Sequence, residues 1–312
     1  MGRKVLKGLL LFNIIFLFSL FFIVNKTFSP ETIKSIRNLN KLYLFLSLFF
    51  LFLVHTFDNL RLFIIARSLG VKYSFLYGYV ISLINTFGAT VTPAHVGGEG
   101  TAVYMLLRKG VSAHKVATIV TLKTLTGLVF FIIAFPYLIF TIPVSNTLVV
   151  IFISLLFLIL LYAVFKFVVG RNSENNFLKK CKIFMRNYLG YLRYFYRRKK
   201  GSFILASLSA VMLYVCFLLI GYFLLLAFNK DIGPFEVLRK QIGLLYAIFV
   251  SPTPGGSGVG EIGGLVVFSG FLNKYELGIF VILWRFISQY ISAFIGGIIF
   301  LLCVIADIKK YS

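Results

Sequence analysis

Long apolar runs bounded by charged residues set the pattern of this chain. A helix needs about 20 apolar residues to cross a bilayer, and continuous runs favour helices over the short alternating segments of a membrane β-barrel. The runs predict full membrane spans near residues 7–24, 41–66, 112–142, 147–169, 201–228 and 275–306. We therefore predict an all-α polytopic integral membrane protein with about six full transmembrane helices.

Two further apolar stretches end in Thr-Pro followed by a cluster of glycines. Each is followed by a shorter apolar piece, which gives the pairs 73–91 with 98–108 and 236–252 with 261–271. Proline removes a backbone donor, and glycine costs about 1 kcal/mol inside a helix. The sequence therefore predicts helix breaks at 92–100 and 253–264, either as re-entrant hairpins or as discontinuous helices that cross the membrane.

The composition places the chain in lipid and near anionic surfaces. Hydrophobic residues make up 60% and charged residues 13%, and 32 Lys and Arg against 9 acids give a net charge of +23. The segment 170–200 is rich in bases and is predicted to be cytoplasmic by the positive-inside rule. Its tyrosines, interleaved with bases, fit an amphipathic helix on anionic membrane lipids better than nucleic-acid binding. We predict a multi-pass protein of the cytoplasmic membrane.

The positions of the other cations favour hairpins at the two breaks. With 170–200 inside, residues 108–115 also fall inside, and the uncharged stretch 143–147 falls outside. If both broken segments turn back, the N-terminus, Arg67, Lys72, Lys309 and Lys310 join the cytoplasmic side. Full crossings would place those residues outside, so the hairpin arrangement obeys the positive-inside rule better.

The two breaks are copies of one plan within a single membrane domain, 1–312. Glu99 and Glu261 lie 162 positions apart, as do Lys123 and Arg285, so each base follows its acid by 24 residues. This predicts a first repeat at 41–142 and a second at 201–306. Three full helices separate the breaks, which makes the repeats inverted in the hairpin arrangement. Inverted repeats with broken helices indicate a transport site near the bilayer midplane.

A helix that begins inside the membrane presents unpaired amides and a partial positive charge at its first turn. Two such ends near two bases would suit a lipid phosphate. The predicted substrate-binding residues are Pro93, Gly97, Gly98, Glu99, Lys123, Pro254, Gly255, Gly256, Gly258, Glu261, Arg285 and Gln289. The alternative is that Glu99 with Lys123, and Glu261 with Arg285, are only paired packing elements.

Other polar positions carry weaker hypotheses. Arg285, Ser288, Gln289 and Ser292 share one helical face, which either lines a cavity or packs against neighbours. His95, beside the first break, is a candidate for proton coupling, and a neutral polar filler is the alternative.

A further polar group lies at the predicted end of a span. It consists of His55, Asp58, Asn59 and Arg61, within two turns of helix. Asp58 and Arg61 can pair at i, i+3. We expect interfacial capping near a membrane edge, with ligand contact as the alternative.

The sequence predicts no catalytic residue, metal site or cofactor. Ser257 lies in a Gly-Gly-Ser-Gly motif, but a serine nucleophile needs a base, and no histidine follows residue 114. No phosphate-binding loop and no metal-ligand spacing is present.

At the two breaks the chain resembles the membrane region of the lysylphosphatidylglycerol synthase/flippase family. The matching residues are Pro93 with Gly97-Gly98-Glu99, and Pro254-Gly255-Gly256 with Gly258 and Glu261. His95-Val96 stands where the family pattern has a more glycine-like loop. Fused members carry a soluble domain that transfers lysine to phosphatidylglycerol, and their membrane part is implicated in flipping the product. This chain resembles the membrane part alone, which implies lipid translocation without synthesis.

We therefore predict translocation of a phosphate-containing lipid or lipid-linked headgroup by a protein that is not an enzyme. Its partners would be a lipid substrate and anionic membrane lipids. Two alternatives stay open: a membrane-embedded transferase acting on a lipid-linked substrate, and a non-transporting subunit that anchors a partner through 170–200.

Overall fold

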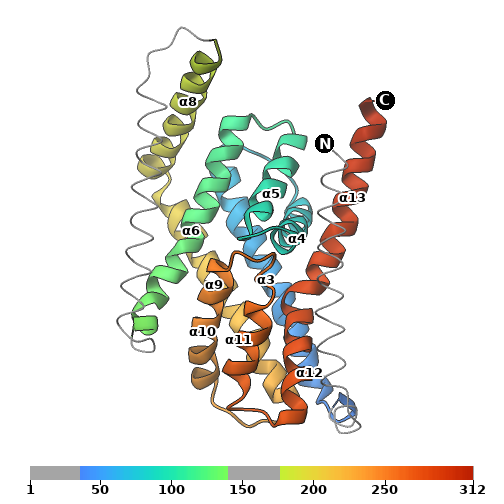
Figure 1. Cartoon of the computed structure of the whole chain (residues 1–312). Coiled ribbons are helices and arrows are strands. Elements are labelled where there is room, and N and C mark those ends of the chain that lie inside the picture. The colour runs from blue at the N-terminus through green and yellow to red at the C-terminus, as the bar shows by residue number, and fades with distance from the viewer. Residues whose placement is uncertain (1–35, 140–175, 312) are drawn as a thin grey trace.

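The computed structural model describes residues 36–139 and 176–311, and these residues form helices joined by short loops (Figure 1). The predicted spans at 7–24 and 147–169 lie outside the described residues. The helices are α3 (Lys41–Ser68), α4 (Phe75–Val91), α5 (Val96–Arg108), α6 (Ala113–Ile139), α8 (Asn176–Arg198), α9 (Lys200–Ala227), α10 (Pro234–Val250), α11 (Val259–Phe268), α12 (Lys274–Arg285), a π-helical segment η1 (Phe286–Tyr290) and α13 (Ile291–Tyr311).

Local sequence explains where several of these helices begin. The Asn40 side chain accepts a hydrogen bond from the Leu42 amide and caps α3. α10 begins with Pro234, whose missing amide proton costs nothing at a first helical position. Asn273 and Glu276 form a capping box at the start of α12. The observed bounds of α3, α6 and α9 agree with the predicted spans 41–66, 112–142 and 201–228 within a few residues.

Four helical stretches in the described residues are long and apolar enough to cross a membrane: Lys41–Ser68, Ala113–Pro136, Lys200–Ala227 and Lys274–Lys309. The chain is therefore all-helical in its described part and has several candidate spans. The predicted span 275–306 is not one regular α-helix, because η1 interrupts it between α12 and α13. The total of six spans and the inverted relation of the two repeats stay predictions.

Of the three apolar cores in the described residues, two lie towards opposite ends of α3. One is built mainly from α3, α4, α5 and α6 and includes Leu62. The other is built mainly from α9, α10 and α12 and includes Leu51. Because α3 contributes to both, its residues between Leu51 and Leu62 lie between the two cores. This intermediate layer holds the polar side chains that make up the candidate site.

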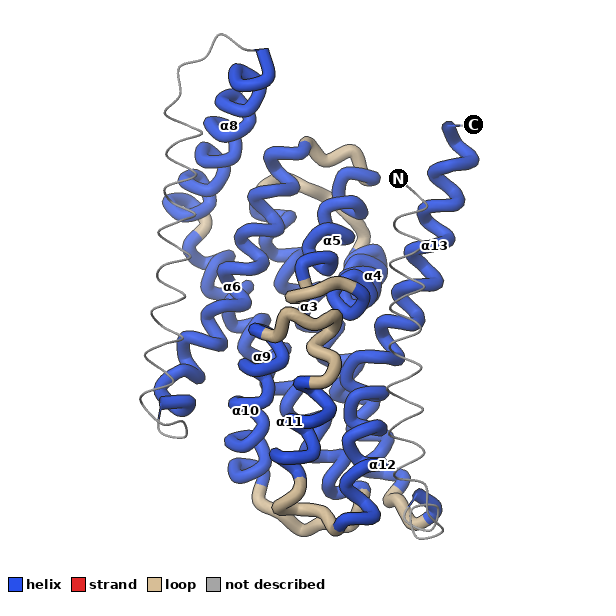
Figure 2. The backbone as a smooth tube through the Cα atoms, viewed as in Figure 1, coloured by secondary structure: helices blue, strands red, loops and turns tan. Residues whose placement is uncertain are grey.

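Both predicted breaks are hairpins whose tips meet. Asn85 of α4 donates to the Gly98 carbonyl, and the Tyr77 hydroxyl donates to the Met105 carbonyl, so α4 and α5 run antiparallel. Figure 2 shows the loop after α4 facing the loop after α10 in the middle of the molecule, with the two hairpins extending towards opposite ends. An antiparallel bridge joins Pro93 to Pro254 at this meeting point.

Candidate functional site

The layer between the cores contains four buried charged side chains. Asp58 and Arg61 lie on α3, Lys123 on α6 and Arg285 at the end of α12, and each is at most 8% exposed. Ionised groups inside a membrane protein are costly and are tolerated when they pair with one another. The pairing of these groups therefore defines the site.

In the first half, Asp58 is shared by two cations. Arg61 Nη2 lies 2.6 Å from Asp58 Oδ1, and Lys123 Nζ lies 3.6 Å from the same oxygen. Lys123 also approaches Glu99 Oε1 at 3.9 Å. The predicted Glu99 and Lys123 contact is therefore present, but it is longer than the contact with Asp58. The other Glu99 oxygen, Oε2, is buried without a hydrogen-bond partner among the described residues.

In the second half, the predicted pair of Glu261 and Arg285 is confirmed and closely held. Arg285 Nε lies 3.0 Å from Glu261 Oε1, to which the Tyr290 hydroxyl donates at 2.7 Å. Glu261 Oε2 accepts a 2.6 Å hydrogen bond from the Gly258 amide. The carboxylate of Glu261 thus occupies the first turn of α11. The expectation that this turn offers an unpaired Gly258 amide to an anion is wrong, because Glu261 itself caps the helix.

The loop of the second break is tied to the first half through Gly255. Arg285 Nη2 and Gln289 Nε2 donate to the Gly255 carbonyl at 2.9 and 3.2 Å, and Gln289 also donates to Thr90 Oγ1 at 3.0 Å. Gly255 has φ +58°, and a Cβ there would lie 2.6 Å from Gln289 Nε2. A side chain at this position would therefore disturb the contact between the two loops.

The glycines of the first break serve helix packing. A Cβ on Gly97 would lie 2.6 Å from Thr92 Oγ1 and 2.7 Å from the Gly88 carbonyl. The Gly97 amide donates to Thr92 Oγ1 at 2.7 Å, so this amide is also satisfied within the loop. Gly98 packs against Asn85 of α4 in the same way. These two residues set the closeness of α4 and α5.

The first loop places two residues other than glycine in a backbone conformation that favours glycine. Ala94 has φ 50° and His95 φ 59°, in the left-handed region that side chains disfavour. The second loop uses glycines for the corresponding turn. The His95 ring stacks on Phe249 with ring centroids 5.5 Å apart, and its Nδ1 atom is buried without a hydrogen-bond partner among the described residues. His95 therefore combines backbone strain with an unused polar atom.

A cavity of about 180 Å³ lies in this layer, between the two hairpins and α3. Three of the predicted residues line it: His95, Arg285 and Gln289. Other polar lining residues are His55, Asp58, Arg61, Ser82, Asn85, Thr86, Thr90 and Ser288. The Arg61 Nε and Ser288 Oγ atoms are buried without hydrogen-bond partners in the described structure. Two residues of the cavity wall thus carry buried polar atoms that no described group satisfies.

The remaining predicted residues lie around this cavity and do not line it. Pro93 and Pro254 form the bridge between the loops. Gly256 and Gly258 have φ +67° and +83° and shape the second turn. Lys123 contacts Asp58, which lines the cavity, and Glu99 contacts Lys123.

The predicted polar face that begins at Arg285 borders the cavity. This is the first of the two alternatives given for it, lining a cavity or packing against neighbours. Ser288 and Gln289 line the space. Ser292 lies one turn further and accepts or donates a 2.7 Å hydrogen bond with His55 Nε2. This face therefore connects the second half of the chain to α3.

His55, Asp58, Asn59 and Arg61 were expected to cap a helix near a membrane edge, and the structure places their side chains inside the helical bundle. All four are buried, and three of them line the cavity. His55 is bonded to Ser82 of α4 at 2.9 Å as well as to Ser292 of α13. The predicted pairing of Asp58 with Arg61 is confirmed. The sequence signal was available: acidic and basic residues inside an apolar run of spanning length are usually functional.

Comparisons with known proteins bear on most of the chain. The family described as "Lysylphosphatidylglycerol synthase TM region" matches residues 5–296. A "UPF0104 membrane protein" of Archaeoglobus fulgidus is 27% identical over 265 residues, which cover 77% of this chain and 80% of that protein.

Proposed function

Because the chain belongs to the lysylphosphatidylglycerol synthase membrane-region family, we propose that this multi-pass membrane protein translocates a phosphate-containing lipid or lipid-linked headgroup. The headgroup passes between the two hairpin tips through the central cavity. The acyl or polyprenyl chains stay in the surrounding lipid, because a cavity of about 180 Å³ is smaller than the ~300–1,000 Å³ pockets that enclose whole drug-sized ligands.

The observation that carries this proposal is the pair of guanidinium groups in the cavity wall. Arg61 comes from α3 and Arg285 from α12, and both line the same space. A guanidinium presents a planar set of donors that matches two phosphate oxygens at once. Arg61 holds Asp58 through Nη2, and its buried Nε atom has no hydrogen-bond partner among the described residues.

The acids in the site keep these cations in the apolar interior until a headgroup arrives. Lys123 is held by Asp58 at 3.6 Å and by Glu99 at 3.9 Å, which are long contacts for an ion pair. The contact of Lys123 with Glu99 is therefore looser than that of Arg285 with Glu261, where the distance is 3.0 Å. His95, with its unpartnered Nδ1 atom, is the proposed position for coupling to protons.

Reconstituted vesicles test this function. Purified protein is inserted into liposomes with fluorescent, NBD-labelled phosphatidylglycerol, and dithionite quenching measures movement between leaflets. We expect Arg61→Gln to slow translocation by about tenfold, as for loss of a charged, hydrogen-bonded contact. Asp58 keeps Lys123 as a partner in this variant. Arg239→Gln, which changes an exposed base on α10, is the matched control and retains the wild-type rate.

A second variant tests the other side of the cavity. Glu261→Gln combined with Arg285→Gln removes both charges of the pair and leaves no unpaired ion behind. Equal rates for wild type, Arg61→Gln and this double variant would remove the proposed site. A covalently altered lipid in the membrane extract, found by mass spectrometry, would favour the transferase alternative.

A further inference from the structure

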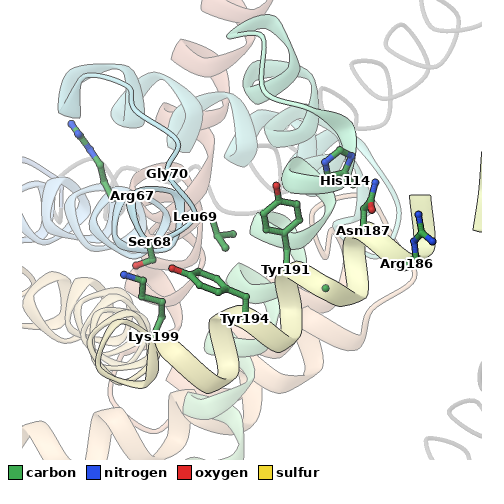
Figure 3. Close-up of a pocket in the computed structure, with 11 residues that line it drawn as sticks. Arg67, Ser68, Leu69, Gly70, His114, Arg186, Asn187, Tyr191, Tyr194 and Lys199 are labelled. Atoms are coloured by element: carbon green, nitrogen blue, oxygen red, sulfur yellow. The ribbon is translucent and has the colours of Figure 1, made fainter. Parts of the chain in front are cut away.

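We propose that a second site, at the junction of α3, α6 and α8, binds a phosphate monoester group. A pocket of about 820 Å³ lies there, apart from the central cavity and sharing no lining residue with it. Its walls come from the end of α3 with Gly70, the start of α6 at His114, and one face of α8 (Figure 3). This inference does not depend on translocation.

The pocket is lined by bases and contains no acid. Arg67, Arg186 and Lys199 are basic, and His114 adds an imidazole ring. None of these three cations forms an ion pair within residues 36–139 and 176–311. Arg67 lies over the Phe63 ring at 4.8 Å and donates to the Tyr73 carbonyl at 3.4 Å, and neither contact neutralises its charge.

Hydroxyl groups and aromatic rings complete the walls. Figure 3 shows Lys199 and Tyr194 reaching towards Ser68 at the end of α3, with Tyr191 between them and His114. The Tyr191 ring stacks on His114 with centroids 5.6 Å apart. The Tyr191 and Tyr194 hydroxyls are donors suited to phosphate oxygens, whereas the Ser68 hydroxyl already donates to the Ile64 carbonyl at 2.8 Å. The site thus combines charge with donors from three helices.

α8 is fixed in place, so the pocket does not depend on a loose surface helix. Phe195 is 1% exposed and belongs to the apolar core formed with α3 and α6. Tyr188 donates a 3.1 Å hydrogen bond to Thr121 of α6. These contacts hold the pocket-lining face of α8, which carries Arg186, Tyr191 and Tyr194, against the bundle.

The charge balance selects the ligand class. Three cations without an acid leave an excess of positive charge, which a dianionic phosphate monoester offsets better than the single charge of a phosphodiester. The group can be borne by a lipid such as phosphatidic acid or by a soluble phosphate. Both sources share the chemistry, and the experiment separates them.

The test measures binding to the full-length protein in detergent. The probes are dioctanoyl phosphatidic acid, dioctanoyl phosphatidylglycerol and inorganic phosphate, each titrated and followed by microscale thermophoresis. We expect phosphatidic acid to bind more tightly than phosphatidylglycerol. Arg186→Gln combined with Lys199→Gln should weaken its binding by about tenfold.

The control is Arg193→Gln with Arg197→Gln, which removes the same charge from exposed positions of α8 that do not line the pocket. We expect this control to change the affinity by less than about twofold. Inorganic phosphate binding as tightly as phosphatidic acid, with the same sensitivity to the pocket variant, supports the site and assigns it to a soluble phosphate. Equal losses in both double variants, or no saturable binding of either phosphatidic acid or inorganic phosphate, overturn the proposal.

Discussion

At the scale of single residues, Asp58 is the acid that forms ion pairs with both buried cations of the first half. Arg61 and Lys123 contact the same Asp58 oxygen, and Glu99 contributes a longer contact. Losing one acid would therefore leave two bases underpaired in an apolar setting. Removing one partner from a buried ion pair is much more damaging than never having had the pair.

We predict that Asp58→Asn lowers the free energy of unfolding by roughly 3–5 kcal/mol, the range for breaking a buried pair. Unfolding of the purified protein in detergent, followed by circular dichroism, measures this. Asp231→Asn makes the same chemical change at an exposed aspartate outside the ion pairs, and we expect a change within about 0.5 kcal/mol. Similar losses for the two variants would contradict the shared-acid arrangement.

The sequence predicted part of this site. The spacing of 24 residues correctly paired Glu261 with Arg285. It did not predict that Asp58 is closer than Glu99 to Lys123, because contacts between distant helices depend on which face of α3 turns inwards. Residues three positions apart on one helix can be paired from the sequence, so the contact of Asp58 with Arg61 was predicted correctly. The burial of both side chains between helices was not predicted.

At the scale of secondary-structure elements, the two hairpin tips form one unit. Pro93 and Pro254 lie opposite each other in an antiparallel bridge, and Gln289 binds both loops. Opposed residues in such a bridge have Cα atoms about 4.5–5.5 Å apart. This spacing falls within the range of roughly 4.4–6.8 Å that a disulfide spans.

We therefore predict that Pro93→Cys combined with Pro254→Cys forms an intramolecular disulfide on mild oxidation. The background protein has Cys181, Cys216 and Cys303 replaced by alanine. Mass spectrometry of the digested protein should find the two loops in one cross-linked peptide. Pro93→Cys with Ser269→Cys is the control, because Ser269 lies beyond the far end of α11, roughly 15 Å along the helix. A cross-link in the control alone would refute the meeting of the tips.

Helix positions were the most predictable feature, because proline, glycine and the length of apolar runs act locally. Both breaks begin at the predicted Thr-Pro positions, but the helices resume at Val96 and Val259, before the predicted ends of the breaks at 100 and 264. The π-helical segment η1 was not predicted, since positions i, i+3, i+4 and i+7 look the same with or without one widened turn. The left-handed turn at Ala94 and His95 was also unexpected, because those residues disfavour it.

At the scale of the whole molecule, each hairpin begins and ends at one end of the bundle. α4 starts and α5 finishes near the end of α3, and α10 starts and α11 finishes at the opposite end (Figure 1). The end of α3, the start of α6 and α8 also meet at one place, where they line the second pocket. This arrangement agrees with the distribution of cations that favoured hairpins over full crossings.

Labelling from the two sides of a membrane tests this arrangement. Single cysteines replace the exposed residues Lys72, Lys109, Asp231 and Lys274 in the cysteine-free background. We predict that a membrane-impermeant maleimide reaches Lys72→Cys and Lys109→Cys from one side and the other two from the opposite side, in right-side-out and inverted vesicles. Labelling of Lys72→Cys and Lys109→Cys from different sides would mean that the first broken segment crosses completely.

Glu99 and Glu261 occupy corresponding positions after the two breaks, but their surroundings differ. Both oxygens of Glu261 accept hydrogen bonds, whereas Glu99 has a side chain 39% exposed and one oxygen without a partner among the described residues. An anion moving between the loops would displace Glu99 from its base more easily than Glu261, because Glu99 makes the longer ion contact. In the proposed translocation the two sides of the site are therefore unequal, and movement in one direction meets the weaker ion contact, that of Glu99 with Lys123, first.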